Sequence, residues 1–395
     1  MPQAKWEFWE ESKSFYNFQV KLCDMNILQI STALPRNEYT TEELIETFPC
    51  TLPSGVLQNV LNLGVSKRAF VTSKSAVSKH KNFPSDPEIV DLCYEACKKA
   101  IKTSRVAMDR IGYFIATYDA NPVLSPGLSQ LLVRKIGFNP YIKHVNVQGI
   151  ASTAFPKALQ LAEDHLAANP KHSVLICVSG VSSFWFQNQV NGIDLVQEIT
   201  QINEIKDEGR RQYELKKWVA TMEYFLFGDG VAAAIVANSD EGLAVKKTVE
   251  VTNLDETDHL AGYAALTSLP EPFKFGFHSN LGREIPKLGV KYTSAALEEL
   301  LGKNTEETIA NCKKWAVHTG SQKILEALAE NHGINPEKLR ESHAMLREHG
   351  NLAGASLPSI LERISSTNRL SKDDVILMLG YGWGFSAAAS LLEVR

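Results

Sequence analysis

The sequence lacks the features that mark secreted, membrane-spanning or nucleic-acid-binding proteins. Its six cysteines form no Cys-x-x-Cys pair, which argues against zinc motifs and against the disulfide framework of a small secreted domain. No run of about eighteen apolar residues occurs, so we expect no membrane span. Residues 1–20 lack the apolar core of a signal peptide, and a formal net charge of −4 argues against a nucleic-acid partner. These absences predict a cytoplasmic protein.

Two of the cysteines agree with a reducing compartment. Cys93 and Cys97 lie one helical turn apart among apolar residues in DPEIVDLCYEACKKAI. In such a setting buried thiols are commoner than a metal site, and reduced thiols fit the cytoplasm. We therefore expect neither a metal ion nor a cofactor.

Segments typical of helices and of strands alternate along the chain. Helical periodicity is present at 86–101 and 156–168, whereas IGYFIAT (111–117) and SVLICVS (173–179) are typical of buried strands. With 395 residues, 44% of them hydrophobic, the chain can bury a large core. The alternation predicts an α/β fold with mainly parallel strands, because crossovers between parallel strands need helices.

Two segments of similar sequence, one in each part of the chain, indicate a duplicated unit. FGDGVAAAIVA (227–237) and YGWGFSAAASLL (381–392) share an aromatic residue, a G-x-G turn and a strand of small residues. We predict an N-terminal extension and two related halves, with bounds at 1–25, 26–238 and 239–395.

A long charged segment, residues 187–224, fits neither half. Its pattern predicts helix, and charge patterning leaves two interpretations open. It is either a solvated helix on the surface, or an insertion that covers the active site or contacts a second subunit.

QGIASTAFPKALQLA (148–162) contains the first candidate for chemistry. The helix begins near Pro156, and the hydroxyl of Ser152 or Thr153 could cap it. The same position also suits a nucleophile, because the positive end of the helix dipole stabilises an anion. The segment alone leaves both interpretations open.

Two further candidates lie in the second half. His318 directly follows the predicted strand KWAV (314–317), and Gly320 next to it allows close approach of the backbone. Asn351 sits in a turn, and small residues after it, Gly354 among them, allow a helix or a ligand chain to pack closely.

In this order, the motifs resemble those of the thiolase-fold condensing enzymes, in the branch of ketoacyl synthase III and the chalcone-synthase-like type III polyketide synthases. The resemblance covers about residues 26–395. It rests on LGVSKRAFV (63–71), FGDGVAAAIV (227–236), VHTGSQKIL (317–325), REHGNLAGAS (347–356) and GYGWGFSAAASLL (380–392). It implies a thiolase-like duplicated five-layer αβαβα fold.

The resemblance also implies a site. The family triad is Cys-His-Asn, and Ser152, His318 and Asn351 fall on its three positions. In the family, a thioester acylates the cysteine, and a malonyl group then loses CO₂ and attacks in a Claisen-type condensation of fatty acid or polyketide biosynthesis. A serine would need His318 as general base.

Three explanations of the serine are open. It is an engineered change that traps a complex, the nucleophile of a natural serine acyltransferase, or the mark of a non-catalytic subunit that pairs with an active homologue. The last is the alternative to an enzymatic function.

The implied substrate is an acyl thioester of coenzyme A or of an acyl carrier protein, which enters through a tunnel. Lys67, Arg68 and Lys74 are candidates to hold its phosphates, although surface lysines are commonly only solvated and Arg68 could be structural. Phe227 falls at the position of a gatekeeper phenylalanine, or is a core aromatic. The resemblance implies a homodimer, with a heterodimer as the alternative.

Overall fold

The computed structural model describes residues 25–74, 77, 86–267, 276–282 and 284–395. Nearly all of the predicted N-terminal extension lies outside the described residues, since the first strand begins at Met25. Among the described residues, no helix is long and apolar enough to span a membrane.

A nine-stranded mixed sheet forms the framework of the fold. Its strand order is β11-β12-β13-β8-β1-β7-β6-β4-β5. Its strands are β1 (Met25–Ala33), β4 (Ile111–Thr117), β5 (Lys143–Val147), β6 (Ser173–Ser179), β7 (Val231–Asn238), β8 (Leu243–Thr252), β11 (Lys314–Val317), β12 (Val375–Gly382) and β13 (Ser386–Val394). Two small antiparallel ladders complete the strands: β2 (Asn37–Thr40) with β3 (Lys67–Phe70), and β9 (Gly262–Thr267) with β10 (Gly276–Leu281).

The prediction of mainly parallel strands is wrong. Only β4–β5, β4–β6 and β11–β12 are parallel pairs in this sheet, and the others are antiparallel. Residues 383–385 show the physical reason, because this short turn joins β12 to β13 and a parallel pair would need a long crossover.

The predicted duplication is visible in the sheet. The four neighbouring strands β8, β13, β12 and β11 follow one another in the sheet with the same relative directions as β1, β7, β6 and β4. The two segments of similar sequence form β7 and β13, which hold equivalent places. We call the part from β1 to β7 the N-terminal half and the part from β8 to β13 the C-terminal half.

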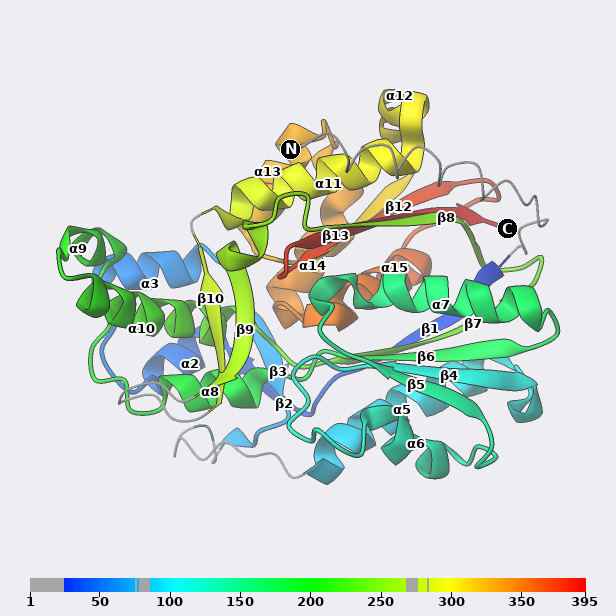
Figure 1. The fold of residues 1–395 in the computed structure, drawn as a ribbon, viewed down its shortest axis with the longest axis horizontal. Coiled ribbons are helices and arrows are strands. Elements are labelled where there is room, and N and C mark those ends of the chain that lie inside the picture. The colour runs from blue at the N-terminus through cyan, green and yellow to red at the C-terminus, as the bar shows by residue number, and fades with distance from the viewer. Residues whose placement is uncertain (1–24, 75–76, 78–85, 268–275, 283) are drawn as a thin grey trace, which may run out of the picture.

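Helices complete five layers (Figure 1). The structure has α2 (Thr41–Glu46), α3 (Ser54–Leu61), α5 (Asp86–Ser104), α6 (Leu128–Ile136), α7 (Ala154–Ala168), α8 (Ser183–Val190), α9 (Ile199–Glu204), α10 (Glu208–Leu226), α11 (Ile285–Leu301), α12 (Thr305–Asn311), α13 (Gln322–Asn331), α14 (Arg340–His349) and α15 (Ser356–Thr367). Figure 1 shows α7 and α15 between the two parts of the sheet, with α5 and α6 outside one part and α11 outside the other. The predicted thiolase-like layering is confirmed.

Small residues let these layers pack closely. In β7, Ala232 and Ala234 face the central helices, whereas Ala233 faces the cluster that contains α5. Cys93 and Cys97 on α5 belong to that second cluster with Cys177 on β6, and all three are fully buried. The prediction of buried thiols is confirmed.

One glycine tests how tightly the halves fit. A Cβ at Gly180, directly after β6, would lie 1.9 Å from the carbonyl oxygen of Leu352 in the C-terminal half. We expect Gly180→Ala to lower the free energy of unfolding by about 1–3 kcal/mol in urea denaturation. In the control Gly289→Ala, within α11, the new Cβ meets nothing within 4 Å, and helix propensity predicts a gain of about 0.5–1 kcal/mol. Equal stability of the two variants would contradict this packing.

Candidate active site

A cavity of about 1150 Å³ lies where the two halves meet, and Ser152, His318 and Asn351 all line it. The first comes from the N-terminal half and the other two from the C-terminal half. The fold therefore brings the three predicted residues to one cavity. Among the described residues, no group of histidine, cysteine and acidic side chains is arranged to hold a metal ion.

Ser152 lies in a short 3₁₀ turn, η3 (Ala151–Thr153), directly before α7. The capping interpretation is wrong, because neither hydroxyl caps the helix and that of Thr153 donates to the carbonyl of Ile150 at 2.7 Å. Ser152 is 7% exposed, and among the described residues its hydroxyl has no hydrogen-bond partner. The hydroxyl is thus available to a ligand in the cavity.

The turn before Ser152 has a strained backbone. Ala151 has a φ of 45°, in the left-handed region, which costs an alanine about 1–2 kcal/mol. Such a residue persists only where its surroundings hold it. The Oδ1 atom of Asp119 does so in part, because it accepts hydrogen bonds from the amides of Gly149 at 2.5 Å and Ile150 at 3.2 Å.

Glycines of the C-terminal half make room for this turn. A Cβ at Gly382 would lie 2.8 Å from the Cβ of Ala151, and one at Gly380 would lie 2.8 Å from the carbonyl oxygen of Ser152. Both glycines belong to β12. Strand β12 therefore determines where the backbone of Ser152 lies.

His318 follows β11 directly, as predicted, and its amide donates to the carbonyl of Leu379 at 3.0 Å. Its ring lies edge-on to that of Tyr381, with 5.3 Å between centroids. The side chain is 3% exposed and Nδ1 has no hydrogen-bond partner. Burial lowers the pKa of His318 to about 3, so the imidazole is neutral near pH 7 and offers one donor and one acceptor nitrogen. Gly320 also lines the cavity, and a Cβ there would lie 2.2 Å from the Tyr381 hydroxyl.

Asn351 is held by both backbone and side chain. Its amide donates to the carbonyl of Leu226 at 2.9 Å, and its carbonyl accepts from the amide of Gly228 at 3.2 Å. Its Oδ1 accepts from the amide of Ala353 at 2.8 Å, so the group left for a ligand is the Nδ2 donor. The turn role and the proposed site role are thus compatible in one residue.

A second turn repeats the geometry of the first. In η7 (Ala353–Ala355), before α15, Ala353 has a φ of 47°, and Gly354 holds the place that Ser152 holds in η3. A Cβ at Gly354 would lie 3.0 Å from the Cβ of Ala154. Gly354 lines the cavity, and its small size lets the two turns pack together.

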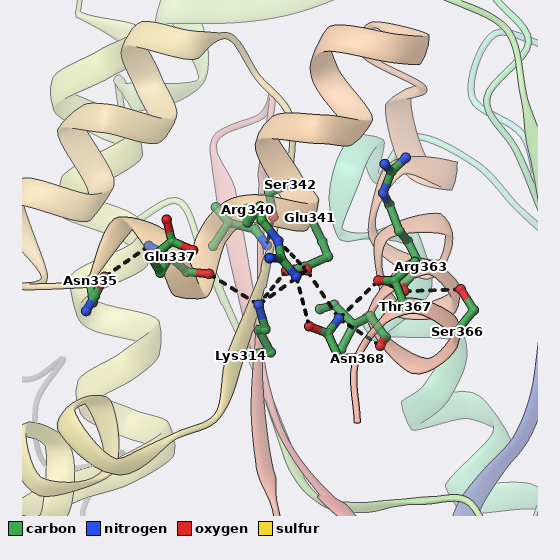
Figure 2. Close-up of polar contacts among 12 residues, drawn as sticks. Lys314, Asn335, Glu337, Arg340, Glu341, Ser342, Arg363, Ser366, Thr367 and Asn368 are labelled. Atoms are coloured by element: carbon green, nitrogen blue, oxygen red, sulfur yellow. Dashed lines mark hydrogen bonds and ion pairs between the residues drawn. The ribbon is translucent and has the colours of Figure 1, made fainter. Parts of the chain in front are cut away.

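A polar cluster connects the elements that carry His318 and Asn351 (Figure 2). Glu341 at the start of α14 accepts hydrogen bonds from Lys314 of β11 at 3.0 Å and from Asn368 after α15 at 3.2 Å. Burial opposes ionisation of Glu341, but these bonds and that from Arg340 lower its pKa. The neighbouring Ser342 hydroxyl accepts from the amide of Val317, directly before His318, at 3.0 Å. The cluster thus ties β11 to α14 and α15.

The segment 187–224 forms part of the cavity wall. Figure 1 shows α8, α9 and α10 gathered on one side of the molecule. The residues of α9 and α10 that line the cavity are Ile199 and Asn203 of α9, and Gln212, Leu215, Trp218, Met222 and Leu226 of α10. Phe227 lines it as well and stacks on Phe186, with 4.5 Å between ring centroids. Of the two interpretations, the structure favours an insertion that covers the site.

The predicted phosphate-binding residues need correction. Arg68 is fully buried and donates to Thr41 Oγ1 at 2.9 Å and to the carbonyl of Phe225 at 2.7 Å. Lys67 and Lys74 are not among the residues that line the cavity, and they pair with Glu38 and Glu43 on the surface. Arg68 is oriented inward because the β2–β3 ladder packs on α10, whose last turn supplies the Phe225 carbonyl.

Two charged residues of the cavity wall were not predicted from the sequence. Lys323 is exposed and lies in the first turn of α13, after His318. Asp119 follows β4, two residues after its last residue, Thr117. The signal that could have identified Asp119 is its place just beyond the carboxyl end of a buried strand, where α/β folds position reacting groups.

Comparisons with known proteins show that the chain is similar to condensing enzymes. Residues 304–394 match the family described as "3-Oxoacyl-[acyl-carrier-protein (ACP)] synthase III C terminal". The chain is 21% identical over 379 residues to 3,5-dihydroxyphenylacetyl-CoA synthase of Amycolatopsis orientalis, with 92% of each chain covered. It is 24% identical over 318 residues to a beta-ketoacyl-[acyl-carrier-protein] synthase III of Clostridium perfringens, covering 78% of this chain and 86% of that one.

Solved structures show the same fold. The 1,3,6,8-tetrahydroxynaphthalene synthase of Streptomyces coelicolor A3(2), a bacterial type III polyketide synthase, superposes with a TM-score of 0.75 at 20% identity, covering 94% of this chain and 99% of that one. CsyB complexed with CoA-SH gives a TM-score of 0.76 at 18% identity, covering 94% and 100%. The predicted resemblance to ketoacyl synthase III and type III polyketide synthases is confirmed.

The burial of His318 predicts a dependence of stability on pH. Its pKa is 6.5 ordinarily and about 3 in the folded protein, so between these values only the unfolded state binds the proton. The stability contributed by the neutral form is fully present above about pH 6.5 and is lost as the pH falls toward 3. We expect His318 to account for about 2–3 kcal/mol of the stability lost between pH 7 and pH 4.5.

Urea unfolding at both pH values tests this expectation. Between pH 7 and pH 4.5, the free energy of unfolding of His318→Gln should fall by about 2–3 kcal/mol less than that of the wild type. The exposed His259 supplies the control, since His259→Gln should behave like the wild type. Equal acid sensitivity of His318→Gln and the wild type would show that His318 is not buried in its neutral form.

Proposed function

We propose that this chain, which has the fold of the type III polyketide synthases, transfers an acyl group from a thioester to Ser152 and then to a carbon nucleophile in a Claisen-type condensation. The observation that carries the proposal is the cavity between the halves, lined by a buried hydroxyl, a neutral imidazole and an amide donor. The related synthases described above, which include a CoA-thioester synthase and a polyketide synthase, support the reaction class.

In the acylation step, the Ser152 hydroxyl gives its proton to the acceptor nitrogen of His318 as its oxygen attacks the thioester carbonyl carbon. The Nδ2 group of Asn351 stabilises the oxyanion that forms. Collapse of this intermediate breaks the carbon–sulfur bond, and the departing thiolate takes the proton from His318. The products are an ester on Ser152 and a free thiol.

In the condensation step, a malonyl thioester loses CO₂ and leaves an enolate. Neutral N–H donors from His318 and Asn351 bind the enolate oxygen, and its carbon attacks the ester carbonyl on Ser152. The serine oxygen then leaves and takes a proton from solvent, which restores the hydroxyl. A histidine with a pKa of about 3 suits this step, because it donates a hydrogen bond without carrying a charge.

The same low pKa slows the acylation step. A histidine that binds protons weakly is a weak general base, and a serine hydroxyl ionises far less readily than a cysteine thiol. We therefore expect slower acylation at Ser152 than at a cysteine in the same place.

The alternative function is a non-catalytic partner subunit. One observation favours it: the Ser152 hydroxyl has no hydrogen bond to His318 or to any other described residue. Intact-protein mass spectrometry after incubation with acyl-CoA or acyl-carrier thioesters distinguishes the two functions.

We expect a mass increase equal to the acyl group, mapped to Ser152 and absent in Ser152→Ala and His318→Ala. No adduct in the wild type, but one in Ser152→Cys, would contradict the serine as acyl acceptor and indicate a changed nucleophile. No adduct in either protein would favour the partner subunit.

Lys323 is proposed to bind a phosphate of the incoming thioester, because among the described residues it is the one cation on the cavity wall. We expect Lys323→Ala to raise KM for an acyl-CoA about three- to tenfold, less so at high salt. Lys67→Ala is the control and should leave KM unchanged. A raised KM in Lys67→Ala, with an unchanged KM in Lys323→Ala, would instead indicate a phosphate site at β3.

The homodimer and the cytoplasmic location stay predictions of the sequence. The acyl chain and the choice between coenzyme A and a carrier protein are questions for a substrate screen on Ser152→Cys.

A further inference from the structure

Asp119 has an unusual place in the cavity. Among the residues that the structure describes, it is the one carboxylate on the cavity wall. The other ionisable side chains there are His318 after β11, Lys323 of α13, Tyr263 of β9 and Tyr381 of β12.

The carboxylate contacts the turn that carries Ser152. Its Oδ1 accepts from the amides of Gly149 and Ile150. Burial raises the pKa of Asp119, while hydrogen bonds from the amides of Gly149, Ile150 and Ala151 act in the opposite direction. The net result is a pKa above the ordinary value for aspartate, because the amide donors, which favour the charged form, offset burial only in part.

The C-terminal half shows that such a turn needs no charge. Its equivalent left-handed residue, Ala353, is held by neutral groups, since Asn351 Oδ1 accepts from its amide at 2.8 Å and the Ser356 hydroxyl accepts from the amide of Leu352 at 3.1 Å. That turn carries Gly354 where the first carries Ser152. Of these two turns, the one that carries the hydroxyl is therefore the one held by a carboxyl group.

A negative charge at this place distinguishes serine from cysteine. It repels a thiolate, which is the reactive form of a cysteine. A serine is neutral at rest, and its proton leaves only as the bond to the carbonyl carbon forms. The carboxylate thus opposes a cysteine nucleophile more than it opposes a serine.

We propose that Asp119 is a positioning residue that holds the Ser152 turn and matches this site to a neutral serine rather than to a thiolate. The inference rests on the proposed function for its kinetic part only.

Its first test is kinetic and uses the wild-type serine. We expect Asp119→Ala, which loses the amide contacts, to lower the acylation rate constant about 10- to 100-fold with little change in KM. Asp119→Asn retains an oxygen acceptor and should recover part of that loss. The matched control is Asp255→Ala, which removes an exposed carboxylate that accepts from the Thr257 amide. Unchanged acylation in Asp119→Ala would overturn the positioning role.

The second test needs no thioester. In the Ser152→Cys protein, the rate of alkylation by iodoacetamide is measured against pH, with and without Asp119→Asn. Removal of the charge should move the pH of half-maximal reactivity downward by about one pH unit, whereas Asp255→Asn should not move it. If the pH of half-maximal alkylation does not change in Asp119→Asn, the proposal that Asp119 suits the site to serine rather than to a thiolate is overturned. Because alkylation is independent of acyl transfer, this result stays interpretable if the proposed function fails, and the unfolding midpoint of each variant identifies misfolding.

Discussion

Two turns with a left-handed alanine, η3 and η7, pack against each other where the halves of the molecule meet. Each also contacts a strand of the opposite half, η3 against β12 and η7 against β6. This approach is possible only because glycines stand where a Cβ would collide with backbone, as at Gly180 and Gly380. The cavity, the placement of Ser152 and the shared hydrophobic cluster of α7 and α15 all depend on this packing.

The two halves have equivalent strand arrangements but contribute different groups to the cavity. In the N-terminal half the turn carries a hydroxyl, whereas in the C-terminal half the same place is Gly354 and the nearby strand end and turn supply His318 and Asn351. Among the described residues, His318 is the one imidazole on the cavity wall, so a site that combines it with the Ser152 hydroxyl uses both halves. The polar cluster around Glu341 keeps the two contributing elements of the C-terminal half in fixed relation.

The electrostatics of the cavity suit chemistry in which charge forms only briefly. His318 is neutral because burial disfavours its proton, and among the described residues the wall carries one carboxylate and one ammonium group. An oxyanion or enolate would therefore meet oriented hydrogen-bond donors and little competing charge. In these surroundings the imidazole near Ser152 is a weak base, because its proton affinity is low.

The sequence by itself determined the local elements and pointed to three residues that the structure brings to one cavity. Strands at 111–117, 173–179 and 314–317 have the predicted bounds, because short apolar runs between turn residues leave few alternatives. Ser152, His318 and Asn351 could be chosen because motif order survives divergence. Only the tertiary structure decided that Arg68 is buried, that Thr153 caps nothing, and that Asp119 and Lys323 line the cavity. These outcomes depend on partners far away in the chain, such as the carbonyl of Phe225 for Arg68 and the amide of Gly149 for Asp119, and no local pattern specifies such contacts.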